Sequence, residues 1–327
     1  MDNQAQNLLI VIVNYFMADD CCRLIESIYE AQPHTLKRIV CVDNSCDQQQ
    51  FTQLEQLKRS LENRSNTDIV LDFNENSENK GFGAAINAAV EHQLTRDRLL
   101  ERVLLINPDV ELEKESIETL LDGASRCPEA GIWGGVTMNH FGEPDGFHAW
   151  REPTALREIA WCLGLSKFLP INALVGDYRR EHKRQTGLTH YAVDVVSGCF
   201  LLITSRLWND VKGFDERFFL YSEEVDLCIR ARHFGANPHV INTVKIKHVR
   251  GTSGHDVTRM KWLVNSKLLY WQKHHGVLKK RLLQYLYALG YLWRGLAFCV
   301  VPQRRHQAQS WIKLACALLF NKTLVKR

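Results

Sequence analysis

The stretch Gly-Phe-Asp-Glu-Arg-Phe-Phe-Leu-Tyr-Ser-Glu-Glu-Val-Asp-Leu-Cys-Ile-Arg, residues 213–230, is the most informative part of this 327-residue chain. A glycine-containing turn and a short aromatic run lead to an acidic pair, Glu223 and Glu224, which opens an apolar-periodic segment typical of a helix. The helix dipole favours acidic residues in a first turn, so a charged helix start is the simplest interpretation. The neighbouring rings favour more than this, because a partly desolvated carboxylate is a stronger base. Such a group suits general-base catalysis.

Apolar strands alternate with helical patterns before this stretch. Residues 8–14 and 103–107 are continuous apolar runs of the kind found in buried parallel strands, and residues 38–43 and 68–73 read as further strands. Residues 82–94 have a helical pattern. This alternation predicts an open α/β sheet with short connections. Ligands bind such sheets at the carboxyl ends of the strands.

Polar residues follow the predicted strands at that edge. Asn14 ends the first strand, Asp43 ends the second, and Asn107-Pro108-Asp109 follows the strand over residues 103–107. A carboxylate at Asp43 can accept hydrogen bonds from a base or a ribose, although Asp after a strand is also ordinary turn chemistry. Asn-Pro-Asp is likewise a common turn tripeptide. These residues are candidates for a ligand-binding site because each of them follows a strand at the carboxyl edge of the sheet.

Residues 79–87, Asn-Lys-Gly-Phe-Gly-Ala-Ala-Ile-Asn, follow a strand and open a helix. A dinucleotide-binding loop would need a small residue where Ile86 stands, and it would follow an earlier strand. A nicotinamide-dependent oxidoreductase would also leave Asp109, Glu224 and His248 without a role. The small residues still allow the backbone to approach a ligand closely.

The charge of the chain is uneven. Its net charge is +4, but residues 258–327 contain 14 Lys and Arg and no Asp or Glu, which leaves 27 basic and 37 acidic residues in 1–257. The body is therefore near −10, which disfavours nucleic acid as the main ligand. Residues 282–301 are mostly apolar, but Gln284 and Arg294 interrupt them. We expect a basic helical tail lying on an anionic membrane surface, with a packed helical subdomain or a true span as the alternatives.

Cysteine usage and the N-terminus bear on the compartment. The ten cysteines form no CxxC motif, which fits reduced thiols better than disulfides or a zinc site. The first residues have no basic region, so we expect no signal peptide. We therefore expect a cytoplasmic protein attached peripherally to the inner face of the cytoplasmic membrane.

Residues 213–230 resemble the acidic signature of family 2 glycosyltransferases, particularly of bacterial rhamnosyltransferase-like members. The shared pattern is Gly-Phe-Asp-Glu, two aromatics, an acid pair with Val-Asp-Leu and Arg, and a His about two dozen residues later; the resemblance covers roughly residues 8–253. It implies a GT-A fold, an open and mostly parallel twisted sheet with flanking helices. In that family the second acid of the pair is the catalytic base and the His can bind a metal, roles that fall here on Glu224 and His248. The family often has Asp at the base position, and Glu224 is one methylene longer.

The same resemblance implies donor-binding and metal-binding residues. Donor-nucleotide contacts fall on residues at the strand ends and on the loop that opens the helix: Asn14, Asp43, Asn79, Gly81 and Asn87. The family's Asp-x-Asp metal motif falls on residues 107–109, with Asn in the first place, so Asp109 would bind Mg²⁺ or Mn²⁺ together with the diphosphate. Magnesium suits such sparse sites, and an imidazole from His248 would favour manganese.

Further residues are expected to bind the acceptor or to support the site: Ser197, Gly198, Glu223, Asp226, Arg230 and Arg250. Ser197 and Gly198 resemble the family's small-residue segment beside the acceptor. Asp226 and Arg230 are expected to hold the acidic loop, and Arg250 to face the diphosphate.

The resemblance predicts an inverting, metal-dependent glycosyltransferase. The expected reaction moves rhamnose from deoxythymidine-diphosphate rhamnose to a hydroxyl of a growing, lipid-linked cell-surface polysaccharide. A catalytically inactive nucleotide-sugar-binding relative and a non-catalytic lipid-binding module remain alternatives. We expect a catalytic domain over residues 1–254, with nucleotide-binding (1–130) and acceptor-binding (131–254) parts, and a membrane-associating tail over 255–327.

Overall fold

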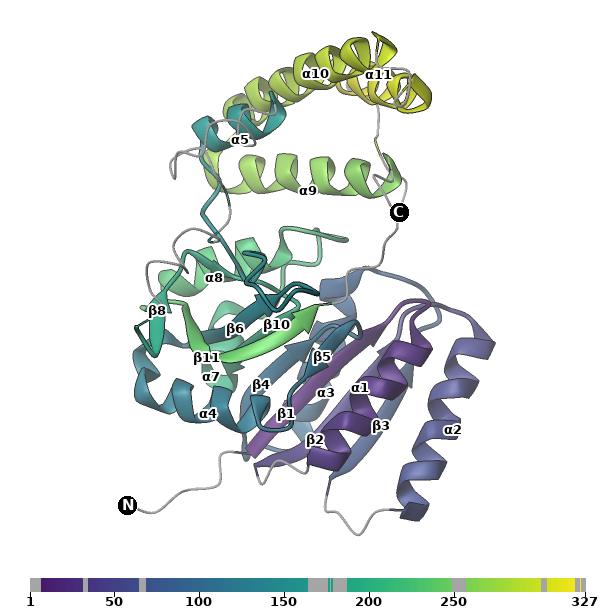
Figure 1. Ribbon diagram of the computed structural model, residues 1–327, viewed down its shortest axis with the longest axis vertical. Helices are drawn as coiled ribbons and strands as arrows, with labels where there is room; N and C mark the ends of the chain where they lie inside the picture. The colour runs from purple at the N-terminus through teal and green to yellow at the C-terminus, as the bar shows by residue number, and fades with distance from the viewer. Residues whose placement is uncertain are drawn as a thin grey trace. The chain divides into compact units, whose positions relative to one another are not determined.

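The computed structural model describes residues 7–31, 35–64, 69–163, 176, 178, 187–248, 257–300, 305–320 and 324. Internal contacts divide the chain into two compact units. We call them the sheet unit (Met1–Trp150, Asp177–Arg217 and Glu223–Gly251) and the helical unit (Arg151–Gly176, Phe218–Ser222 and Thr252–Arg327). Figure 1 draws the helices and strands of both.

The strands of the sheet unit are β1 (Asn7–Asn14), β2 (Leu36–Asp43), β3 (Val70–Glu75), β4 (Leu100–Ile106), β5 (Val110–Leu112), β6 (Ile132–Met138), β7 (Ala149–Trp150), β8 (His190–Ala192), β9 (Val195–Val196), β10 (Phe200–Thr204) and β11 (His239–His248). Its helices are α1 (Ala18–Ala31), α2 (Gln48–Arg64), α3 (Phe82–Arg96), α4 (Ser116–Arg126), the 3₁₀ helix η1 (Pro128–Ala130), α7 (Ser205–Val211) and α8 (Glu223–Arg232).

The main sheet has the strand order β3-β2-β1-β4-β10-β6-β11-β5, and β8 pairs with β11. β1 is parallel to β2 and β4, whereas β10 is antiparallel to both β4 and β6. β6 therefore runs in the same direction as β1 and β4, and β11 is parallel to β6. The carboxyl ends of these strands meet at one edge, which confirms the predicted α/β architecture.

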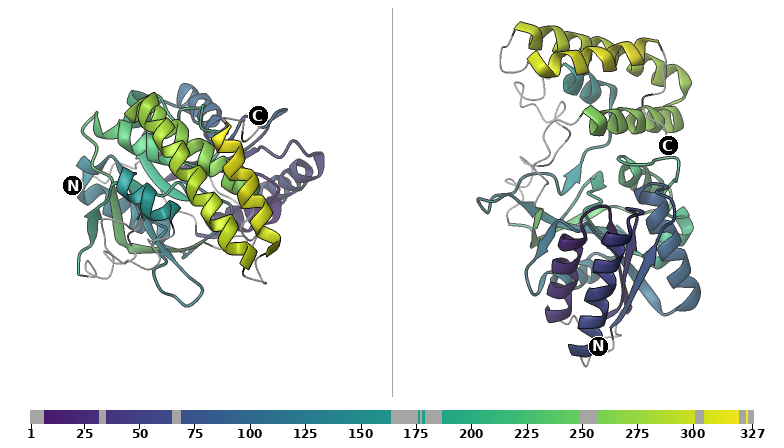
Figure 2. Two further views of the ribbon diagram at one scale, coloured as in Figure 1. Left: turned by 90° about the horizontal axis from the view of Figure 1, so that it is seen from above. Right: turned by 90° about the vertical axis from the view of Figure 1, so that its right-hand side faces the viewer.

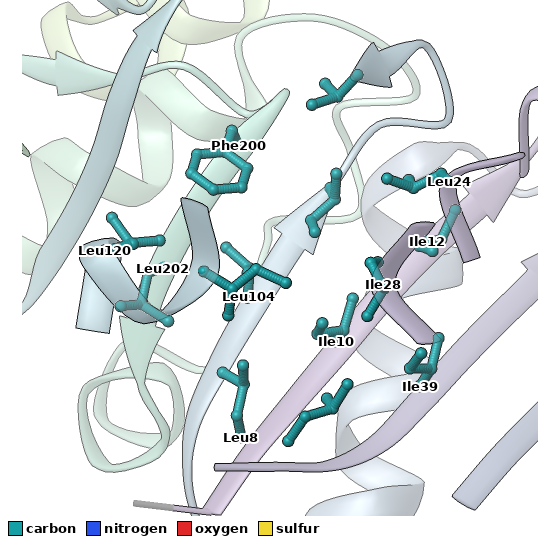
Figure 3. Packing of buried hydrophobic residues seen from close by; sticks show 14 of the residues in the cluster. Leu8, Ile10, Ile12, Leu24, Ile28, Ile39, Leu104, Leu120, Phe200 and Leu202 are labelled. Carbon is teal, nitrogen blue, oxygen red and sulfur yellow. The ribbon is translucent and has the colours of Figure 1, made fainter. Parts of the chain in front are cut away.

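Helices cover both faces of this sheet, which explains why β1 is apolar at almost every position. Leu8, Ile10 and Ile12 point toward the layer of α1 and α4, as Figure 3 shows. The alternating residues between them face the side on which α3 packs. Burying each such Leu or Ile contributes about 1.5–3 kcal/mol, so the strand is held firmly in register.

Two segments differ from what their sequences predict. The apolar residues 193–203 predict one strand, but the chain turns at residues 197–199, between β9 and β10. Residues 134–194 have no regular pattern and predict loops and short helices, but they begin within the central strand β6. Its glycines lower strand propensity, but packing requires them: a Cβ on Gly134 would lie 2.6 Å from Val196 Cγ1, and one on Gly135 would lie 2.7 Å from Val244 Cγ1.

The helical unit contains α5 (Ala155–Cys162), α9 (Val257–His275), α10 (Val277–Val300) and α11 (Arg305–Leu319). The tail is helical, as expected, but α5 from an earlier part of the chain packs with it. α10 and α11 lie side by side as a hairpin (Figure 2). Gln284 Nε2 donates to the Leu318 carbonyl at 2.7 Å, which fixes their antiparallel register.

A buried ion pair joins α5 to the tail helices. The Glu158 carboxylate is 3% exposed and accepts hydrogen bonds from Lys267 Nζ at 3.0 and 2.8 Å and from the Tyr287 hydroxyl at 2.5 Å. Lys267 Nζ also lies 4.3 Å from the centroid of a Trp161 ring, a cation–π contact. A paired and hydrogen-bonded charge tolerates such burial. These contacts group residues 151–163 with the tail and not with the sheet.

Candidate active site

The ends of β1 and β2 are joined by a buried hydrogen-bond network. Asn14 Nδ2 donates to Asp43 Oδ1 at 2.8 Å, and both residues are fully buried. Ser45 donates its backbone N–H to Asp43 Oδ1 at 3.1 Å and its hydroxyl to Oδ2 at 3.0 Å. The structure therefore brings Asn14 and Asp43 together at the carboxyl edge. Their contacts with nucleotide remain a prediction.

The loop before α3 is tied to the same edge through asparagine side chains. Asn79 Oδ1 accepts hydrogen bonds from the Gly81 N–H and from Asn44 Nδ2, both at 2.9 Å. Asn44 Oδ1 accepts one from Asn76 Nδ2 at 3.0 Å. Gly81 has φ 105°, a conformation that favours glycine, which explains its place in the motif. Sequence reasoning did not assign site roles to Asn44 and Asn76, although the run of polar residues around Gly81 was the available signal.

Asn87 lies farther along α3 and contacts the loop that leads to the acidic pair. Its Oδ1 accepts the Phe214 N–H at 2.8 Å, and its Nδ2 donates to the Phe214 carbonyl at 2.9 Å and to Glu216 Oε1 at 3.1 Å. A Cβ on Gly213 would lie 2.5 Å from Asn87 Oδ1, and Gly213 has φ 62°. Because residue 213 is glycine, the backbone of Gly213 and Phe214 can lie directly against the Asn87 side-chain amide.

Asp226 and Arg230 of α8 hold the same loop through a second set of hydrogen bonds. Asp226, fully buried, accepts a hydrogen bond from Arg230 Nε at 2.7 Å. Arg230 also donates to the carbonyls of Val211 and Gly213, the latter at 2.7 Å. The spacing of four residues on α8 places the two side chains together, as the sequence predicts for one helical turn.

The acidic pair begins α8 directly after two residues with strained backbone. Tyr221 and Ser222, directly before it, have φ 71° and 66°, each costing about 1–2 kcal/mol for a non-glycine residue. Glu223 is buried and Glu224 is partly exposed, and Oε2 of each is buried without a hydrogen-bond partner among the described residues. A Cβ on Gly198 would lie 3.5 Å from Glu224 Cβ, so the turn before β10 lies directly beside this side chain.

The electrostatics separate the two carboxylates. Burial raises the pKa of both groups, and the Glu224 charge raises the pKa of Glu223 further. The pair therefore ionises at higher pH than ordinary carboxyl groups, and Glu224 is the member with a partly exposed side chain. An ionised, poorly solvated carboxylate with a free oxygen can accept a proton from a hydroxyl.

Asp109 and His248 are brought together by strand pairing. β5 follows the Asp109 turn and pairs antiparallel with β11, with Val110 opposite His248. Asp109 Oδ1 and His248 Nε2 are 3.1 Å apart, and both side chains are partly shielded. The Asn107 N–H donates to the Cys199 carbonyl at 2.9 Å, which secures the turn.

This pair fits a divalent cation whose remaining ligands come from the substrate. No cluster of three or more His, Cys, Asp or Glu able to hold a metal occurs in the described parts of the chain. One carboxylate and one imidazole therefore cannot form an all-protein cage. They do match a site for Mg²⁺ or Mn²⁺ that phosphate oxygens complete. Arg250, predicted to face the diphosphate, lies outside the described residues.

Two exposed aromatic residues at this edge were missed by the sequence reasoning. Tyr15 and Phe16 follow Asn14 directly, are 55% and 56% exposed, and lie with ring centroids 5.0 Å apart. Phe16 also has φ 55°, an uncommon conformation outside glycine. Strain at an exposed ring often marks a functional position. The signal in the sequence was an aromatic pair placed directly after a buried strand.

Comparison with known protein families shows which family this chain belongs to. Residues 5–265 match the family described as glycosyltransferase like family 2. The chain belongs to this family. The match confirms the family 2 membership that the acidic signature indicated.

Two curated relatives of this family 2 chain are informative. It is 31% identical over 187 residues to the N-acetylglucosaminyl-diphospho-decaprenol L-rhamnosyltransferase of Mycobacterium tuberculosis, covering 54% of this chain and 59% of the relative. It is 28% identical over 232 residues to the low-salt glycan biosynthesis hexosyltransferase Agl10 of Haloferax volcanii, covering 71% and 63%. The chain thus spans less than two thirds of the length of either relative.

A solved structure shows the same fold. The mannosyltransferase PcManGT from Pyrobaculum calidifontis, solved in complex with GDP-Man and Mn²⁺, aligns with a TM-score of 0.58 at 13% identity, covering 97% of this chain and 88% of that one. The GT-A architecture predicted for the family 2 chain is confirmed. At this identity the likeness concerns the fold alone.

Proposed function

We propose that this family 2 member is an inverting, metal-dependent glycosyltransferase that uses a nucleotide-diphosphate sugar. The observation that carries the proposal is Glu224, a carboxylate with a buried, unpartnered oxygen at the start of α8. Its sheet unit also contains the Asp109–His248 pair and the polar edge at Asn14 and Asp43. A base, a cation site and a nucleotide edge are the three parts that such a transfer needs.

Glu224 supplies the base in a single displacement. Its carboxylate accepts the proton of an acceptor hydroxyl while that oxygen forms a bond to the anomeric carbon. The bond from the anomeric carbon to the diphosphate oxygen breaks, and the nucleoside diphosphate leaves with the electron pair. Attack from the face opposite the leaving group inverts the configuration. Asp109 and His248 would hold the Mg²⁺ or Mn²⁺ that neutralises the charge on the leaving diphosphate.

The carboxyl edge of the sheet binds the donor nucleotide in this proposal. Asn79 and Gly81 bring backbone close to the base and ribose, next to Asp43. Tyr15 and Phe16 offer exposed rings on which a base can stack, a contact that alanine substitution values at about 1–3 kcal/mol.

The names of the relatives support a choice of donor and acceptor. The mycobacterial relative is named a rhamnosyltransferase acting on a diphospho-decaprenol, which supports rhamnose from deoxythymidine-diphosphate rhamnose and a lipid-linked glycan acceptor. The archaeal relative is named a hexosyltransferase, so hexose donors belong in the test. A lipid-linked acceptor places the enzyme at the inner face of a membrane during synthesis of a surface polysaccharide.

The test is donor hydrolysis over a panel of nucleotide sugars with Mn²⁺, Mg²⁺ or EDTA. We expect slow, metal-dependent hydrolysis of one donor by the wild type and its loss in Asp109→Ala. Nucleotide binding is measured in parallel by calorimetry. Absence of both hydrolysis and binding would overturn the proposal. Binding without hydrolysis, unchanged by Glu224→Gln, would instead indicate an inactive nucleotide-sugar-binding relative.

A further inference from the structure

The outward face of α10 carries a continuous stripe of large apolar side chains. Its members recur every three or four residues and are each more than half exposed: Leu278, Leu282, Tyr285, Leu289, Trp293, Leu296 and Val300. At 3.6 residues per turn this spacing keeps them on one side of the helix. From Leu278 to Val300 the helix rises by about 33 Å, at 1.5 Å per residue. We call this row of apolar side chains the α10 stripe.

Three polar side chains in the middle of α10, those of Gln284, Tyr287 and Arg294, point the other way. Gln284 is buried and bonds the Leu318 carbonyl of α11. Tyr287 is fully buried and bonds Glu158, and Arg294 donates to the Trp161 carbonyl while lying over aromatic rings. A helix on a water-facing surface shows the opposite arrangement, with its apolar face inward. The outward face of α10 is therefore built for contact with something less polar than water.

Charge around the stripe indicates what that contact is. Exposed Lys279 and Arg281 flank the stripe at its first turn, and exposed Arg305 begins α11. No Asp or Glu occurs between residues 258 and 327 to neutralise them. Tyr285 and Trp293 within the stripe are the residue types that prefer the boundary between water and lipid. This combination matches an anionic bilayer surface.

A second copy of the chain fits the stripe less well. If two stripes packed in parallel, Lys279 and Arg281 would face their own copies. If they packed antiparallel, these residues would face the end of α10 near Arg305. Both arrangements set cations against cations with no acid between them, which disfavours pairing.

The packing of α10 also determines how it can meet a bilayer. Its inward face contacts α5, α9 and α11, so only one side of the helix is available. Among the described helices none has the length and hydropathy needed to cross a membrane. A helix available on one side binds in the plane of the interface, with its apolar side chains in the outer part of the acyl region.

We infer that the α10 stripe, with Lys279 and Arg281 at its end, docks the chain onto an anionic lipid surface. The inference deepens the proposed function by naming the surface through which the enzyme reaches a lipid-linked acceptor. Docking needs neither donor nor acceptor, and donor hydrolysis needs no vesicle. The two proposals can therefore fail separately.

The experiment is vesicle flotation of the full chain with phosphatidylcholine alone and with phosphatidylcholine and phosphatidylglycerol in a three-to-one ratio. The wild type should float with the anionic vesicles. Leu289→Glu/Trp293→Glu should bind them at least tenfold more weakly, because two charges replace side chains that enter the interface. The matched control is Leu99→Glu/Phe234→Glu, which adds the same charges at exposed apolar positions of the sheet unit and should float like the wild type.

Charge is tested with Lys279→Gln/Arg281→Gln. This variant should weaken binding to anionic vesicles by about fivefold for each charge removed, and added salt should reduce the difference. Circular dichroism confirms that each variant is folded. Equal flotation of the stripe variant and its control, or no flotation of the wild type, would overturn the inference. So would a wild-type dimer in light scattering that the stripe variant alone converts to a monomer.

Discussion

Two buried carboxylates, one in each unit of the molecule, have opposite surroundings. Glu158 in the helical unit bonds Lys267 through both oxygens and also accepts the Tyr287 hydroxyl. Glu223 in the sheet unit is almost as buried, yet its Oε2 has no hydrogen-bond partner among the described residues, and neither does that of Glu224. A buried carboxylate that is paired with a cation stays charged and can hold structural elements together. A buried carboxylate without such a partner has a raised pKa, as catalytic acids and bases often do. The difference separates a carboxylate that holds helices together from an acidic pair of which one member, Glu224, is available for reaction.

The largest expected effect is that of Glu224→Gln. Gln keeps the shape but cannot accept the proton of an acceptor hydroxyl, so kcat should fall about 10²–10⁴-fold while donor binding stays within twofold. Turnover is measured with hexosyl and rhamnosyl nucleotide-sugar donors and a soluble acceptor. Donor affinity is measured by calorimetry. The matched exchange in the other unit is Glu158→Gln, which should leave kcat of the folded enzyme unchanged. Equal losses of kcat in both variants would remove the distinction between the two carboxylates.

The next effect concerns stability and not turnover. Lys267→Met leaves the Glu158 carboxylate buried without its cation, so the free energy of unfolding should fall by about 3–5 kcal/mol. Thermal melting followed by circular dichroism measures this loss. The exposed Lys313→Met on α11 serves as the control and should change stability by less than about 0.5 kcal/mol. Adding Glu158→Leu to Lys267→Met should restore much of the loss, and a further loss would contradict a role for the ion pair.

The sequence predicted the sheet unit better than the helical unit, for physical reasons. Strands buried on both faces, such as β1, are continuous apolar runs and can be recognised locally. β6 was missed because Gly134 and Gly135 make it look irregular, and the contacts that require glycine come from residues about 60 and 110 positions away. The packing of α5 against the tail depends on Glu158 and Lys267, which are equally distant in sequence. Local patterns contain no information on such pairs.

The residues of the candidate site also differ in how well the sequence predicted them. Glu224, Asp109 and His248 could be found because a motif fixes their order, and strand pairing then brings the last two to 3.1 Å. Asn87 was expected at the nucleotide because its motif lies near the Gly81 loop, but its amide is bonded to the backbone of Phe214. Successive side chains of a helix point in different directions around its axis. Residues that are neighbours in a motif can therefore contact different parts of a site.

Asn87→Leu distinguishes these two roles. Loss of two hydrogen bonds to the Phe214 backbone leaves buried polar groups unpaired and should lower stability by about 1–3 kcal/mol. The loop before Glu224 would loosen, so we expect kcat to fall about tenfold with little change in the KM for donor. Steady-state kinetics at several donor concentrations measure both constants. A rise in the KM for donor with unchanged kcat would show instead that Asn87 contacts the nucleotide.

The smallest effect is expected from Glu223→Gln, which tests whether the two neighbouring acids differ in protonation. Because burial and the Glu224 charge hold the pKa of Glu223 well above its ordinary value of 4.5, Gln imitates its neutral form, and kcat at neutral pH should change less than about threefold. The acidic limb of the profile of kcat/KM against pH belongs to Glu224 and should lie above pH 4.5 in both proteins.

Stability should respond to Glu223→Gln with a defined sign. A carboxyl whose pKa is raised in the folded state stabilises that state while it is protonated, and this contribution is lost as the pH rises through the raised pKa. Wild-type stability should therefore decline with rising pH more steeply than that of Glu223→Gln, as urea unfolding across the pH range would measure. If Glu223→Gln instead abolished turnover and left the pH dependence of stability unchanged, Glu223 would be the reactive carboxylate. The contrast with the paired Glu158 would then apply to Glu223 and not to Glu224.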